Sequence, residues 1–188
     1  IGDSDCEVTL TLEESYFPIN ACAKTVVSDD ELTELLDICA HTLKYCRQSH
    51  HLDSPLHCEP LACVGDYYIE MLMNMFAYGD TSLTEFDLER IAITMEERDG
   101  RLFHTTYSLI FVKMVYECYM LSGNASLLYK TKRAIDLLLN RFEGYIGENG
   151  LIETPPDYMF IDWLCPDGIS MHHPPKSLGQ TCLCMFYY

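Results

Sequence analysis

The chain has 188 residues, 48% of them apolar, and its 29 acidic residues against 12 basic ones give a formal net charge of −17. This length and apolar content suit one globular domain with a sizeable core and exclude the composition of a disordered chain. So strong a negative charge repels phosphate backbones and anionic lipid, which argues against nucleic-acid and membrane partners.

The ten cysteines are spaced irregularly and form no Cys-x-x-Cys pair, so their pattern does not predict a zinc site. Several lie in apolar helical stretches, where a free thiol packs as a small apolar group: Cys39, Cys118 and Cys182. We therefore expect reduced thiols, a reducing compartment and a cytoplasmic location. No apolar run reaches the roughly 18 residues that a membrane span requires.

The first predicted elements are a short strand and an amphipathic helix. Residues 6–11 alternate and are rich in β-branched side chains, which is typical of a strand. Ser28 and Glu31 bracket a capping-box sequence that predicts a helix start, and the helix should run to about Gln48. One apolar stripe along this helix is expected to face the core: Leu32, Leu35, Leu36, Cys39, Leu43 and Cys46.

Five further helices follow an irregular loop over residues 49–62. Apolar periodicity and stop signals predict helices over 63–78, 86–97, 107–121 and 126–142, with another beginning near Leu178. The helix over 63–78 is apolar almost all round, so it should be buried. Gly147-Glu-Asn-Gly150 predicts a hairpin turn.

Short turns alternate with long loops along this series, which suits an all-α toroid of alternating inner and outer helices with its long loops at one end. Six helices would form about half of an (α/α)6 ring, so we expect residues 28–188 to be the first part of a truncated domain. Residues 1–27 would be a strand and linker leaving a preceding β-sandwich domain. A free-standing helical bundle explains the helices equally well but explains the long, Pro-rich loops less well.

Three carboxylates, Asp53, Glu59 and Asp66, fall within a run of 14 residues. Glycoside hydrolysis requires a carboxylic acid to protonate the leaving oxygen and a carboxylate to activate water or attack carbon. A cluster of acids also raises the pKa of one member, which suits a general acid. Because the chain is acidic throughout, the same residues are also explained as solvated loop acids.

The run from Asp53 to Asp66 reads D-S-P-L-H-C-E-P-L-A-C-V-G-D. It resembles the loop D-C-P-x-R-x-E-R-x-G-W-x-G-D of bacterial α-L-rhamnosidases of glycoside hydrolase family 78, with the Asp, Pro, Glu, second Gly and final Asp in register. The following stretch, residues 67–80, is similar to the next helix of that family. Further on, Phe160-Ile-Asp-Trp-Leu164 resembles its (F/G)-x-D-W-L segment.

The resemblance implies a six-hairpin glycosidase that inverts configuration as it cleaves terminal α-L-rhamnosyl or related glycosides. Glu59 falls on the general acid of the family, and Asp53 and Asp66 fall on carboxylates that bind sugar hydroxyls. Trp163 falls on a tryptophan that lines the sugar pocket, and Asp162 beside it could hydrogen-bond a hydroxyl. The implied partner is a carbohydrate substrate, and no cofactor is implied. Core packing at a loop–helix junction also explains Trp163.

The sequence departs from the family pattern at His57, Pro60 and Cys63, where the family has Arg, Arg and Trp. We expect His57 to line the pocket, while the lost Arg and Trp leave rhamnose itself open as the substrate. The family's general base would lie beyond Tyr188, so the fragment alone should be inactive. The alternatives are a non-catalytic carbohydrate-binding or scaffold relative and a plain α/α-repeat interaction protein.

The histidine pairs His50-His51 and His172-His173 raise the possibility of a metal site. They lack the i,i+4 helical spacing that would support shared ligation. The sequence therefore predicts no metal centre.

Overall fold

The computed structural model describes residues 7–20, 23, 25–54, 63–153, 155–160 and 181–188. Over these ranges the chain is all-α, as predicted, with six helices and no strand. The helices are α1 (Asp30–Cys46), α2 (Val64–Tyr78), α3 (Ser82–Glu97), α4 (Thr105–Ser122), α5 (Ala125–Glu143) and α6 (Thr181–Tyr187).

The starts of α1 and α3 differ from the predicted ones. Asp29, rather than Ser28, is the N-cap of α1, and its carboxylate accepts a hydrogen bond from the amide of Leu32 at 3.0 Å. α3 begins four residues earlier than predicted, directly after Thr81, whose hydroxyl donates to the Glu85 carboxylate at 3.0 Å. The segments before α1 and α3 each contain several possible capping residues in a row. The sequence pattern therefore determined the first residue of each helix only to within about one turn.

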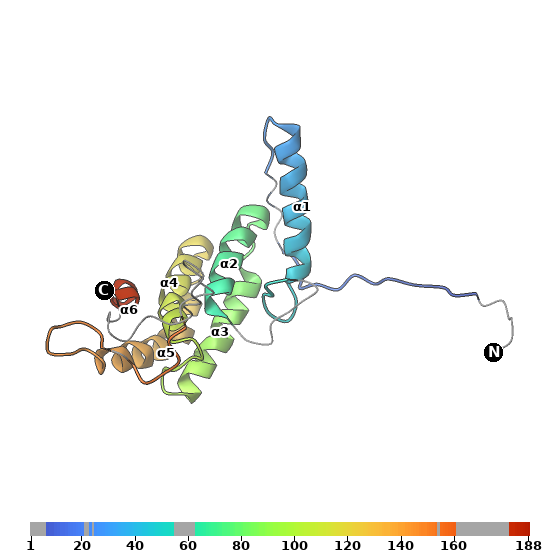
Figure 1. Cartoon of the computed structure of the whole chain (residues 1–188). Coiled ribbons are helices and arrows are strands. Elements are labelled where there is room, and N and C mark those ends of the chain that lie inside the picture. The colour runs from blue at the N-terminus through green and yellow to red at the C-terminus, as the bar shows by residue number, and fades with distance from the viewer. Residues whose placement is uncertain (1–6, 21–22, 24, 55–62, 154, 161–180) are drawn as a thin grey trace, which may run out of the picture.

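Helices that are next but one in sequence pack side by side. α2 packs on α4 and α4 on α6, while α3 packs on α5, so the helices form two layers joined chiefly where α4 meets α5 (Figure 1). The core lies between these layers. Its fully buried side chains come from four helices: Met71, Leu88, Met95, Phe111, Met114, Leu138 and Phe142.

α1 projects from the other helices and is covered only at its last turns (Figure 1). Leu43 and Cys46 are buried, but Leu32, Leu35 and Leu36 remain 51%, 54% and 40% exposed. The predicted apolar stripe therefore exists, but only its C-terminal end contacts the core.

Two other expectations are corrected. Residues 7–11 of the predicted strand are extended but not a strand, because no described segment pairs with them, and a strand requires a partner. α2 is not buried all round: Met71 is buried, whereas Met73 and Phe76 on its opposite face are exposed.

The chain after α5 turns back toward the start of α4. The predicted turn is present, since the Gly147 amide donates to the Leu151 carbonyl at 2.9 Å. Asp157 is then held by Arg141 at 2.6 Å, and the Thr105 amide donates to the Tyr158 carbonyl at 3.1 Å. Residues 155–160 are thereby fixed against the first turn of α4.

Gly100 lies where α3 approaches α5 closely, and Gly123 offers a comparison because it has a similar positive φ without a close neighbour. Gly100 (φ 75°) follows α3, and a Cβ there would lie 2.7 Å from the backbone of Leu137 on α5. Gly123 (φ 69°) ends α4, and a Cβ there would meet nothing within 4 Å.

We expect Gly123→Ala to lower the free energy of unfolding by about 1–2 kcal/mol, the strain of a left-handed alanine alone. Gly100→Ala carries the same strain and must also separate two helices, so we expect a loss of at least about 3 kcal/mol. Urea denaturation of both variants measures the difference. Equal losses would contradict the close packing of α3 on α5.

Candidate functional site

The described ends of three connections meet where α2 and α4 begin. The Cys63 thiol, which precedes α2, lies 3.9 Å from Nδ1 of His104, which precedes α4. The His104 ring packs against Tyr158 and Phe160, with centroids 5.9 and 5.0 Å away. The segment that leads into Asp162 and Trp163 therefore approaches the end of the loop that resembles the glycosidase loop.

The structure describes two of the six predicted site residues. Asp53 is exposed and Asp66 is half-buried in the first turn of α2, and both act electrostatically on the same carboxyl group, that of Glu70. Both acids therefore lie near enough to Glu70 to influence its carboxyl group, while their role in binding a sugar stays a prediction. The other four lie outside the described residues: His57, Glu59, Asp162 and Trp163.

Glu70 is a functional candidate that sequence reasoning missed. It lies one turn beyond Asp66 on α2, is only 5% exposed, and its Oε2 atom has no hydrogen-bond partner among the described residues. Burial, followed by the charges of Asp66, Asp87 and Asp53, raises the pKa of Glu70 to about 9. Glu70 is therefore a neutral carboxylic acid at physiological pH. The sequence signal was a single acid, four residues after Asp66, inside an apolar helix.

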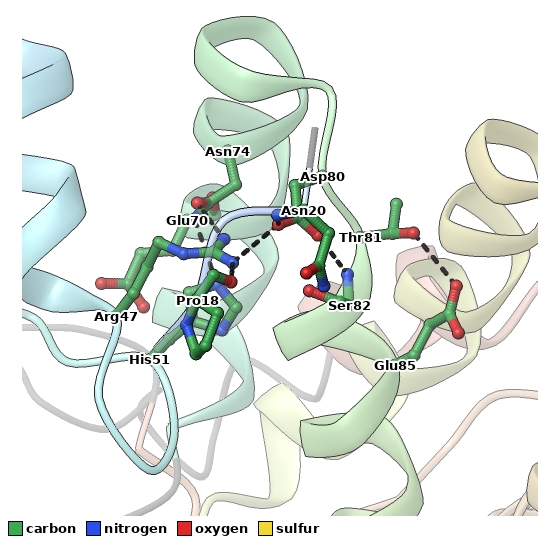
Figure 2. Close-up of polar contacts among 10 residues, drawn as sticks. All are labelled: Pro18, Asn20, Arg47, His51, Glu70, Asn74, Asp80, Thr81, Ser82 and Glu85. Carbon is green, nitrogen blue, oxygen red and sulfur yellow. Dashed lines mark hydrogen bonds and ion pairs between the residues drawn. The ribbon is translucent and has the colours of Figure 1, made fainter. Parts of the chain in front are cut away.

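A buried polar network adjoins Glu70 (Figure 2). Arg47, at the end of α1, is fully buried and donates to Asp80 at 3.0 Å, to the Asn74 side-chain oxygen at 2.5 Å and to the Pro18 carbonyl at 3.1 Å. Asp80 also accepts from the Asn20 amide at 2.9 Å. The network thus joins the N-terminal segment to α1, α2 and the start of α3.

The contacts of Asn74 determine the state of His51. Since the Asn74 oxygen accepts from Arg47, its nitrogen must donate, and it does so toward Nε2 of His51 at 3.1 Å. Nε2 is then an acceptor, so the proton is on Nδ1, which lies 2.7 Å from Asp87. We therefore assign His51 as a neutral, structural histidine, with Asp87 as its partner on α3.

An open groove of about 310 Å³ lies beside this network, between α2 and α3. Its walls include His50, Tyr67, Asp87 and Arg90. Arg90 is held in place by donating to the Ser49 carbonyl at 2.9 Å. The groove is therefore bordered by residues 47–54, the segment that carries Asp53.

Other chemistries find little support in the described part of the chain. No group of three or more His, Cys, Asp or Glu side chains there could hold a metal ion, and none of its helices could span a bilayer. The side chains of five cysteines are described, and all are free thiols: Cys39, Cys46, Cys63, Cys118 and Cys184. Burial raises the pKa of Cys46 to about 11 and that of Cys118 to about 12, so these two are poor nucleophiles.

Comparison with protein-family models, curated proteins and solved structures gives no match to this chain. The functional argument therefore depends on the chain's own residues and on the resemblance of its loop.

Glu70 should make stability depend on pH. Folded, it keeps its proton up to about pH 9, whereas in the unfolded chain it ionises near the ordinary value of a glutamate. Between these values the unfolded chain binds fewer protons, so the stability present at acidic pH is lost as pH rises. We expect wild-type protein to lose about 2–4 kcal/mol between about pH 5 and pH 8, and Glu70→Gln to lose much less.

Urea denaturation at each pH measures this difference. Glu117→Gln is the control, because Glu117 pairs with Lys113 on the surface of α4 and its removal should leave the pH dependence intact. The same decline in Glu70→Gln as in wild type would show that Glu70 is ionised.

The buried Arg47–Asp80 pair should contribute more to the free energy of unfolding than any exposed ion pair does. Arg47→Ala leaves Asp80 buried without a counter-ion, so we expect a loss of about 3–5 kcal/mol. Lys130→Ala, which breaks the exposed pair with Glu89, should cost less than about 1 kcal/mol. Similar losses in chemical denaturation would contradict the burial of the network.

Proposed function

We propose that this chain is part of a glycoside hydrolase of the α-L-rhamnosidase type and contributes the acid side of its sugar site. The observation that carries the proposal is the resemblance of residues 53–66 to the acid-bearing loop of that family. The two ends of this loop, Asp53 and Asp66, both lie near enough to the buried Glu70 carboxyl to raise its pKa. Residues 158–160, the last of which begins the second resembling segment, pack at the start of α4 beside Cys63.

The helix packing supports the toroidal part of the proposal. Packing of α2 on α4, of α4 on α6 and of α3 on α5 is the order that alternating inner and outer helices produce. A simple up-and-down bundle would instead pack mainly sequential neighbours. α2 and α4 would be inner helices, and the rest of the ring would cover apolar side chains that are exposed here, such as Phe76 and Met120.

In the proposed mechanism, Glu59 protonates the glycosidic oxygen as the bond breaks. Asp53 and Asp66 accept hydrogen bonds from sugar hydroxyls, and the negative charge of the site stabilises an oxocarbenium-like transition state. Trp163 stacks on the C–H face of the sugar, beside Asp162. A carboxylate from the remainder of the ring activates water on the opposite face.

Glu59→Gln in the full-length protein tests the proposal. With an alkyl rhamnoside, whose leaving group needs protonation, we expect kcat to fall by about 10²–10⁴ with KM little changed. With a nitrophenyl rhamnoside, whose leaving group departs as an anion, the loss should be much smaller.

Glu148→Gln is the matched control, because Glu148 is exposed in the turn after α5. Near-wild-type turnover of the alkyl glycoside by Glu59→Gln would refute the assignment of the acid. A wild-type protein that binds sugar without cleaving any glycoside would favour the non-catalytic relative.

A further inference from the structure

Glu70 is the one buried carboxyl of the described residues with an oxygen that lacks a partner there. Buried polar atoms are usually hydrogen-bonded. Four other buried side-chain atoms of the described residues also lack a partner, namely Nε of Arg47 and the hydroxyls of Ser82, Thr84 and Thr105, but among the five only the Glu70 oxygen could carry a negative charge. The neighbouring buried acids Asp80 and Asp87 are satisfied, by Arg47 and His51 respectively. Arg47 and His51 are thereby engaged elsewhere and give Glu70 no positive partner.

The described surroundings of Glu70 are acidic or neutral. Cys46 approaches from α1, Asp53 from the loop that follows, Asp66 and Tyr67 from its own helix, and Asp87 from α3. A buried carboxylate here would gain no cation from these groups, and its Oε2 atom would gain no donor, at a cost of several kcal/mol. The geometry therefore requires the protonated form, which carries an O–H group in need of an acceptor.

A neutral acid among carboxylates completes a site for a sugar. Carboxylates only accept hydrogen bonds, so a hydroxyl that donates to Asp53 or Asp66 still has oxygen lone pairs without a donor. A protonated Glu70 supplies that donor. Carboxylates alone would instead favour a cation.

We propose that Glu70 is a substrate-binding residue whose carboxylic acid donates a hydrogen bond to a hydroxyl oxygen of a sugar held by Asp53 and Asp66. This inference rests on the proposed glycosidase function and adds to it a residue outside the loop that resembles the family. The donor exists only while Glu70 is protonated. Since burial and the three neighbouring carboxylates raise its pKa to about 9, sugar binding weakens above that pH.

The test compares two substitutions in the full-length protein, with KM and kcat for a nitrophenyl α-L-rhamnoside followed from about pH 6 to about pH 10. Glu70→Gln keeps a neutral donor, so KM should stay within about threefold of wild type and its alkaline rise should vanish. Glu70→Met has similar length but no donor, so KM should rise about tenfold at every pH.

Comparing the stability of Glu70→Met with that of wild type distinguishes a substrate-binding Glu70 from a purely structural one. Glu70→Met removes an unpartnered polar group from the interior, so it should unfold at the same or higher urea concentration than wild type while binding substrate more weakly. A purely structural Glu70 would give the reverse, a less stable Glu70→Met protein with unchanged KM. That result, or an alkaline rise in KM that persists in Glu70→Gln, would overturn the proposal and leave the glycosidase function standing.

If the wild-type full-length protein cleaves no rhamnoside, calorimetric titration with free L-rhamnose separates the two proposals. Binding that is retained in Glu70→Gln and lost in Glu70→Met would support the role of Glu70 and reject the catalytic function. Equal binding by all three proteins would overturn the role of Glu70. Absence of any binding would overturn both proposals.

Discussion

The buried ion pair between Arg47 and Asp80 is the constraint on which the rest of the described structure depends. A fully buried guanidinium is stable only where its charge is matched and most of its donors are bonded. Here the two terminal nitrogens of Arg47 donate to the N-terminal segment, to α2 and to Asp80 before α3, while Nε has no partner among the described residues. Satisfying Arg47 therefore fixes where α1 ends against α2. It also fixes where the loop of residues 47–54 emerges, and with it the position of Asp53.

The same pair determines the chemistry beside it. Because Arg47 orients the amide of Asn74, His51 is held as the Nδ1–H form that satisfies Asp87. The positive charge and the donors of this region are then occupied, and Glu70 receives neither from them. The neutral state of Glu70 is thus a consequence of a network in which it takes no side-chain part.

Local signals predicted the helices, and long-range contacts explain what they missed. Periodicity found all six helices, yet it shows which face of α1 is apolar and not what covers it, so the exposure of Leu32 and Leu35 was not foreseen. The strand over 6–11 failed for the same reason, since one segment alone does not determine its pairing. The resemblance of their loop marked Asp53 and Asp66 as candidates, and their role stays a prediction. Arg47, His51 and Glu70 could not be selected from the sequence, because their roles depend on partners distant in sequence.

The two-layer packing explains why the acids gather at one end. α2 and α4 each leave by a short turn at a left-handed glycine, Gly79 or Gly123, and each is entered by a long connection, so their N-termini share the long-loop end. Helix N-termini favour negative charge, but only within the first turn. Asp66 lies in that turn and Glu70 lies one turn deeper, beyond its influence. Under the proposed function, the two carboxyls four residues apart would have opposite roles, Asp66 as an acceptor of sugar hydroxyls and Glu70 as a neutral donor.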